Sequence, residues 1–201
     1  MEPKDLPWPK AGDVLFQPAE DWWNNACLNY TSNTWDLYAT GYKEAADNLA
    51  KSVDETRHHA DLFVYPIVFL YRHYLELRLK DLLMMGQELT ARPQDLKHIH
   101  RIDILWSMCR PILEEVWPNS EREALDAVED CIKQFVKVDP ASMSFRYPAT
   151  KDGKPTLPDI KHINLRNLKD VLARTSALLE GASMGISSHL DNKREMTTAF
   201  L

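Results

Sequence analysis

The sequence predicts an all-α fold, a bundle of four to five helices. The longest apolar run, residues 62–85, has the length of a buried helix and carries charged residues in its middle. Four further segments repeat apolar residues at the three- and four-residue spacing of a helix face. The chain of 201 residues, with 44% hydrophobic and 27% charged residues, is long enough for one domain with a substantial core.

The expected helices follow from this periodicity and from residues that begin or end helices. Thr34 is placed to cap the first helix, and Gly86 to end the second. Pro66 either kinks the second helix or marks its start, and Pro111 is expected to bend the third. The predicted helices span about 35–53, 58–85, 102–116, 121–138 and 165–180.

The domain organisation predicted from composition has three parts. Residues 1–34 form an irregular arm, with a short helix around 19–28, whose tryptophans pack on the bundle. Residues 35–185 form the helical bundle, and residues 186–201 form a tail that is either a further helix or disordered. Before the last core helix lies a long loop in which KDGKP predicts a tight turn, flanked by short extended pieces at 145–148 and 156–157 that form a small hairpin.

Composition excludes several classes of protein. The three cysteines lack CxxC spacing, which argues against a disulfide framework or a zinc ribbon and favours the reducing cytoplasm. The apolar run contains too many charges for a membrane span, and we expect no membrane association. A net charge of −6 is atypical of a general nucleic-acid binder, although a local basic site for RNA is compatible with it. There is no phosphate-binding glycine loop, GxSxG or HExxH motif.

A polar stripe runs along the predicted central helix. Arg72, His73, Glu76 and Lys80 fall within about a quarter of the helix circumference, together with large aromatic residues. The Arg72–Glu76 and Glu76–Lys80 pairs have the i,i+4 spacing that lets opposite charges meet. The stripe is either a salt-bridge ladder where the helix reaches solvent, or a polar pocket or dimer seam within the core.

Further candidate residues lie on the connections between helices. His98 and His100 form an HxH motif. The spacing of Arg92 and His98 resembles that of one superfamily of helical ribonucleases, which implies an arginine that holds the phosphate and a histidine for acid–base work. The alternative for both is an ordinary surface loop. In the long loop, Arg146 and Tyr147 are candidates for substrate binding. The guanidinium of Arg146 would reach either a carboxylate such as Glu76, which would fasten the loop to the bundle, or a phosphate.

Five sequence blocks occur in a fixed order: GYKEAAD (41–47), YPIVFLYRHYLELRLKDLL (65–83), HRIDILW (100–106), DPASMSFRYP (139–148) and INLRNLKDVL (163–172). Together they resemble a group of bacterial proteins with a HEPN-like helical bundle. The resemblance covers residues 38–180 and implies a bundle of four to five helices, often a homodimer, in anti-phage defence or toxin–antitoxin systems. Active HEPN ribonucleases carry an arginine–histidine pair on a late helix. Here the Arg92–His98 spacing occurs earlier, which leaves a non-catalytic scaffold open.

Two functional hypotheses follow. The first is a metal-independent endoribonuclease, with His73, His98 or His100 for acid–base work and Arg72, Arg92 or Arg146 holding the phosphate. In it, Glu76, Lys80, Arg146 and Tyr147 contact RNA. The second is a non-catalytic module that forms homodimers or binds a nucleotide, an antitoxin or another partner protein. Neither hypothesis requires a cofactor or a metal; a metal-dependent hydrolase is a third interpretation.

Overall fold

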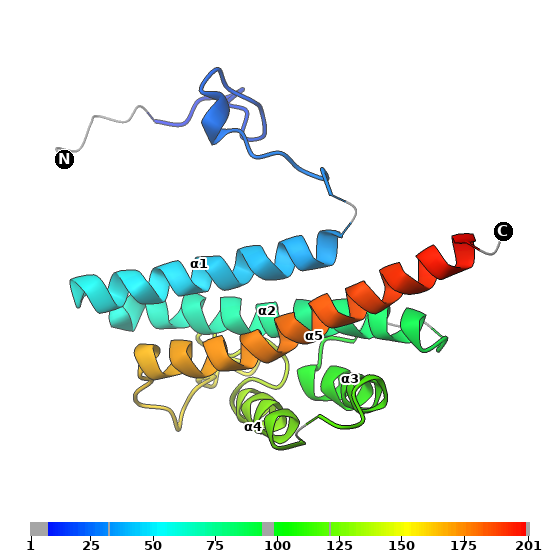
Figure 1. Cartoon of the computed structure of the whole chain (residues 1–201). Helices are drawn as coiled ribbons and strands as arrows, with labels where there is room; N and C mark the ends of the chain where they lie inside the picture. The colour runs from blue at the N-terminus through cyan, green and yellow to red at the C-terminus, as the bar shows by residue number, and fades with distance from the viewer. Residues whose placement is uncertain (1–7, 32, 94–98, 121, 200–201) are drawn as a thin grey trace. The chain divides into compact units, whose positions relative to one another are not determined.

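The computed structural model describes residues 8–31, 33–93, 99–120 and 122–199. These residues form one short 3₁₀ helix, η1, and five α-helices, and they contain no β-strand, so the all-α prediction is confirmed (Figure 1). The α-helices are α1 (Thr34–Thr56), α2 (Ala60–Leu89), α3 (Ile102–Val116), α4 (Arg122–Val138) and α5 (Leu165–Ala199).

The chain divides into two compact units, residues 1–32 and residues 33–201. In the first unit, the helix expected over 19–28 is reduced to η1 (Trp22–Asn24). The amide side chain of Asn25 closes a loop there by bonding both backbone groups of Ala19, at 2.8 and 2.7 Å. The boundary lies two residues before the one predicted. That the arm packs on the bundle stays a prediction.

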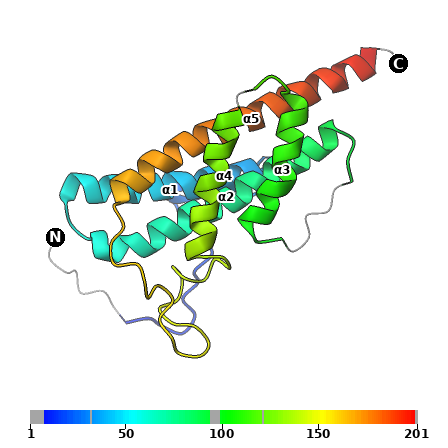
Figure 2. The same ribbon diagram turned by 90° about the horizontal axis from the view of Figure 1, so that it is seen from below.

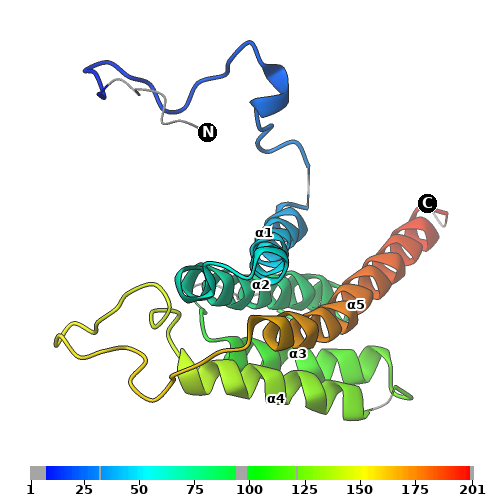
Figure 3. The ribbon, with the colours of Figure 1, turned by 90° about the vertical axis from the view of Figure 1, so that its left-hand side faces the viewer.

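In the second unit, α2 is the central helix. It packs against α1, α3 and α5, and α4 lies against α3 and α5 (Figures 2 and 3). Because α2 is covered from several directions, its apolar residues are buried almost all round, as the long apolar run predicts. The core includes the fully buried α2 side chains Tyr71, Tyr74, Leu75 and Leu79.

The boundaries of α1 and α2 differ in detail from those predicted. Asn33, not Thr34, caps α1, by accepting a hydrogen bond from the backbone N–H of Asp36 at 3.2 Å. Pro66 lies inside α2, and so does Gly86, which was expected to end it. A Cβ at Gly86 would stand 2.7 Å from the Ile112 side chain. The glycine therefore provides space for α3 to approach α2, and the helix continues to Leu89.

For residues from 186 onward, the sequence leaves open a further helix or disorder. In the structure, α5 continues without a break to Ala199, so the helical alternative is the one found there. Gly181 and Gly185 lie inside this helix, and Ile186 and Leu190 are buried beyond them. Burial of these side chains offsets the roughly 1 kcal/mol that each glycine costs a helix relative to alanine.

The loop between α4 and α5 is longer than any other connection, and it projects beyond the helices at one end of the bundle (Figures 2 and 3). Its predicted turn is present: Thr150 N–H bonds Lys154 O at 2.8 Å, and Gly153 has a φ of +76°. The predicted hairpin is reduced to a single antiparallel bridge between Ala149 and Pro155.

Two predictions about chemical environment can also be compared with the structure. Cys27, Cys109 and Cys131 are all free thiols, as their spacing predicts. Among the helices in the described part of the chain, none combines the length and the low charge that a membrane span requires.

Candidate functional site

Glu76 is the centre of a charge cluster on α2. Its carboxylate accepts hydrogen bonds from Arg72 at 3.1 Å and from Lys80 at 2.9 Å, so both predicted i,i+4 pairs form. The third neighbour is the Nδ1 atom of His100, 2.9 Å from Oε1. Burial alone would raise the pKa of Glu76, but the hydrogen bonds from Lys80, His100 and Arg72 hold it below its usual value.

The cluster lies inside the bundle and not at its surface. The exposed fractions are 0% for Arg72, 4% for Glu76 and 7% for Lys80. Arg72 also donates to the backbone carbonyls of His100 at 2.8 Å and Asp139 at 3.4 Å. One guanidinium therefore joins α2 to the residues just before α3 and just after α4.

His100 is the accessible member of the cluster. Its side chain is 69% exposed, although its Nδ1 atom contacts the buried carboxylate of Glu76. This arrangement orients the imidazole and leaves Nε2 facing away from the carboxylate. The sequence predicts His100 as a candidate site residue, and the structure places it beside Glu76.

His73 occupies a different environment, between aromatic rings. Its ring meets Tyr42 edge-on at a centroid distance of 4.4 Å and stacks on Phe69 at 5.8 Å with an interplanar angle of 9°. Burial lowers the pKa of His73; Glu76 opposes this, and the Arg72 and Lys80 cations add to it. The neutral imidazole is therefore favoured.

Arg146 and Tyr147 do not join the Glu76 cluster. The guanidinium carbon of Arg146 lies 5.5 Å from the centroid of the Phe69 ring and 5.4 Å from that of Tyr147. Of the two partners that the sequence leaves open for Arg146, the Glu76 carboxylate is thus not used. The loop is fastened to α2 through an aromatic ring instead.

The structure describes only one member of the predicted Arg92–His98 pair. Arg92 forms an ion pair with Glu115 of α3, which occupies its guanidinium. His98 lies outside the described residues. Within those residues, no group of three or more His, Cys, Asp or Glu side chains is arranged to hold a metal ion.

A second buried charge network lies on the opposite side of α2. None of its residues is among the site residues that the sequence predicts. Arg78 bonds Asp81 at 3.1 Å and Asp36 of α1 at 2.7 Å, and the hydroxyl of Ser183 on α5 donates to Asp81 at 3.0 Å. Burial raises the pKa of the Asp81 carboxyl in spite of these partners. The i,i+3 spacing of Arg78 and Asp81 is the sequence signal for it.

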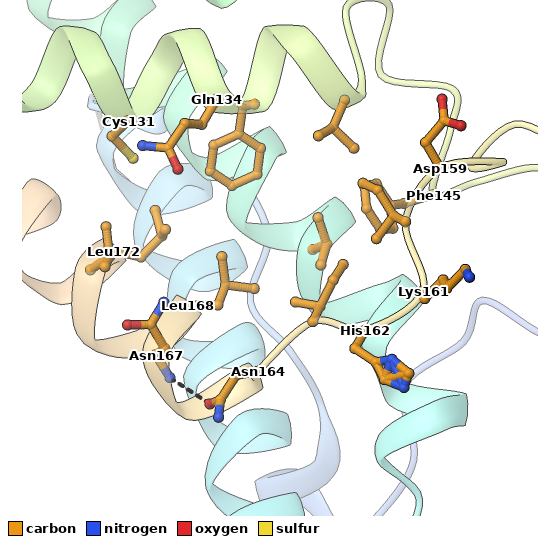
Figure 4. Close-up of a pocket in the computed structure, with 16 residues that line it drawn as sticks. Cys131, Gln134, Phe145, Asp159, Lys161, His162, Asn164, Asn167, Leu168 and Leu172 are labelled. Atoms are coloured by element: carbon orange, nitrogen blue, oxygen red, sulfur yellow. Dashed lines mark hydrogen bonds between the residues drawn. The ribbon is translucent and has the colours of Figure 1, made fainter.

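A groove of about 480 Å³ lies between α4, the start of α5 and the segment 159–164 (Figure 4). Its lining combines apolar side chains, with Phe135 and Leu172 among them, and polar residues. Asn164, one of the polar residues, caps α5, because its side chain accepts from the Asn167 backbone N–H at 2.9 Å. The groove lies apart from the Glu76 cluster and contains none of the predicted site residues.

Comparisons with protein-family models, with curated proteins and with solved structures gave no match. The resemblance to HEPN-like bundles therefore stays a prediction, and the functional argument rests on the geometry of the chain itself.

Proposed function

We propose that this chain is a non-catalytic helical binding module, in which the Glu76 cluster stabilises the bundle and groups on the surface contact a ligand or partner. The observation that carries the proposal is the burial of Arg72. An arginine that holds a substrate phosphate needs guanidinium N–H donors that the substrate can reach. Arg72 is fully buried, and presenting it to a substrate would break its bonds to Glu76, His100 and Asp139.

Lys80 supports the same conclusion. Its ammonium bonds Glu76 at 2.9 Å and lies over the ring of Trp35 at 5.9 Å. A buried charge is stable only when it is paired, so these cations neutralise Glu76 and are not available to a substrate. Binding is then left to accessible groups, among them Arg146 and Tyr147.

The proposal includes homodimer formation or binding of a partner protein such as an antitoxin in a bacterium, as the HEPN-like resemblance implies. It also includes the cytoplasm as the location, which the cysteine pattern favours. The middle of α2 is buried by helices of its own chain. A dimer interface on α2 would therefore use its exposed beginning, with Leu62 and Tyr65. Light scattering across a concentration series tests this part. If the protein is a monomer at every concentration, the proposed homodimer is wrong.

A second candidate is metal-independent cleavage of RNA, and the observation that favours it is the Glu76–His100 contact. A carboxylate that orients an exposed imidazole is a usual device for general acid–base catalysis. His100 would transfer the proton, and the exposed Arg146 would hold the phosphate.

One assay separates the two candidates. Wild-type protein is incubated with structured and single-stranded RNA in EDTA, beside the His100→Ala and His73→Ala variants. The binding-module proposal expects no cleavage above background in any sample. Cleavage by wild type that is lost in His100→Ala would overturn it in favour of the ribonuclease. Cleavage that persists in both variants would indicate a contaminating nuclease.

A further inference from the structure

Arg146 is an exposed cation that pairs with no acidic side chain of the described residues. Among the described residues, no carboxylate lies within ion-pair distance of its guanidinium. Arg110, by contrast, contacts three carboxylates of α3 and α4. What holds Arg146 is the pair of ring faces of Phe69 and Tyr147. Cation–π contacts position a guanidinium but leave its N–H donors unused.

The ring of Phe69 is itself held in place by a second ring. It stacks on His73, and His73 meets Tyr42 edge-on, so ring contacts continue from α1 through α2 to the loop. The guanidinium is the last member of this row of contacts. A cation mounted in this way is ordered before any ligand arrives, which reduces the entropy lost on binding.

The loop around Arg146 is also held in one conformation. The Asp139 carboxylate accepts the backbone N–H groups of Met143 at 2.7 Å and Ser144 at 3.0 Å. The hydroxyl of Thr156 lies 2.7 Å from the Tyr147 carbonyl and 3.0 Å from that of Ser144. Phe145, between these two residues, is buried in the core. The loop is thus fastened at both ends of the short segment that carries Arg146.

Arg146 lines a cavity of about 490 Å³, a size that suits small-molecule ligands. The aromatic rings of Tyr65 and Tyr147 form part of its wall, and both are about half exposed. The cavity therefore combines one uncompensated guanidinium with two accessible aromatic rings. A guanidinium binds phosphate through paired hydrogen bonds, and aromatic rings stack on planar bases.

We propose that this cavity binds a nucleoside monophosphate, with the phosphate on Arg146 and the base against Tyr65 or Tyr147. This inference rests on the proposed function and names the ligand class of the binding module. A carboxylate or phosphate without a ring would use only the cation, and a nucleoside would use only the rings. Both parts of the ligand are needed for full affinity.

The test is calorimetric titration of the full chain with AMP, adenosine and inorganic phosphate. We expect AMP to bind at least about tenfold more tightly than either fragment. In Arg146→Gln the affinity for AMP should fall at least about tenfold, the loss expected for a charge-assisted hydrogen bond. The matched control is Arg174→Gln, another exposed arginine, which lines none of the cavities described above and should leave AMP binding unchanged.

Tyr147→Leu gives a second measurement, because it removes a ring and keeps the guanidinium. It should weaken binding of AMP more than binding of inorganic phosphate, because the Phe69 ring still contacts the guanidinium. Absence of AMP binding to wild type, or equal affinity in Arg146→Gln and wild type, would overturn the inference. Its failure is distinct from that of the proposed function, which only RNA cleavage dependent on His100 would overturn.

Discussion

Glu76 is the residue on which the electrostatics of the bundle depend. Three potential donors converge on it, and two of them, Arg72 and Lys80, are basic side chains buried within the core. Each cation is tolerated at its position because this carboxylate is ionised beside it. Since its pKa is lowered, the ionised carboxylate contributes stability above about pH 4.5 that is lost as the pH falls below that value.

Glu76→Gln should therefore destabilise the protein by about 3–5 kcal/mol, because it leaves Arg72 and Lys80 buried without a counter-charge. Urea denaturation at pH 7 measures the change. The matched control is Glu55→Gln, which breaks an exposed i,i+4 pair with Lys51 and should cost less than about 1 kcal/mol. Equal effects of the two substitutions would contradict a stabilising role for the cluster.

His73 predicts a pH dependence with a definite sign. Its pKa in the folded chain is lower than the 6.5 of a free histidine, so the unfolded chain takes up the proton first. The contribution of His73 to stability is constant well above pH 6.5 and falls as the pH drops through about 6.5 toward the pKa of the folded chain. His73→Phe keeps a ring between Tyr42 and Phe69 and removes the titration.

We expect the free energies of unfolding of wild type and His73→Phe to diverge in favour of the variant as the pH falls from about 7.5 to 5. Urea denaturation at four or five pH values measures the difference. Curves that remain parallel across this range would show that His73 does not titrate differently in the folded chain.

At the scale of elements, α5 illustrates how packing overrides helix propensity. A Cβ at Gly185 would stand 2.7 Å from a ring carbon of Trp117, the residue that follows α3. At Gly181, one turn earlier, a Cβ would meet nothing within 4 Å. The same substitution at the two positions should thus have opposite effects.

Gly185→Ala should destabilise the protein by about 1–3 kcal/mol, because the rigid indole has to move. Gly181→Ala should stabilise it by about 1 kcal/mol through helix propensity alone. Thermal denaturation followed by circular dichroism compares both with wild type. If both variants were stabilised, α5 would not approach Trp117 as closely as described.

At the scale of the whole molecule, the hydrophobic core is formed by residues of the bundle. Every buried side chain of the hydrophobic core belongs to residues from Ala39 onward, within the described part of the chain. The arm, for its part, carries the exposed aromatic residues Trp8, Phe16, Trp22 and Trp23. The two units can therefore be tested separately.

A chain of residues 33–201 should fold and unfold cooperatively, because it retains the entire core. Circular dichroism and thermal denaturation of this shortened chain against the full chain measure the effect. An unchanged midpoint would count against the predicted packing of the arm on the bundle, and a midpoint lower by several degrees would support it. A shortened chain that does not fold would contradict an independent bundle.

Much of the fold follows from local sequence pattern. The bounds predicted for α3, 102–116, agree with the structure, because its apolar periodicity is strong and its flanking residues interrupt it. The Arg72–Glu76 and Glu76–Lys80 contacts were also predictable, since i,i+4 neighbours on a helix meet whatever surrounds them. The extension of α5 past two glycines was not predictable, because it depends on side chains from other helices that bury Ile186 and Leu190.

The candidate site also has a part that follows from local sequence pattern and a part that depends on tertiary packing. The sequence by itself determined that α2 is the core helix and that a paired charge stripe runs along it, because helix geometry and the apolar pattern are local properties of the chain. Only the tertiary structure decided that the stripe is buried, that His100 reaches Glu76, and that Arg146 stands on Phe69 instead. Those contacts join residues 24 to 77 positions apart, and their geometry depends on how the connecting loops pack.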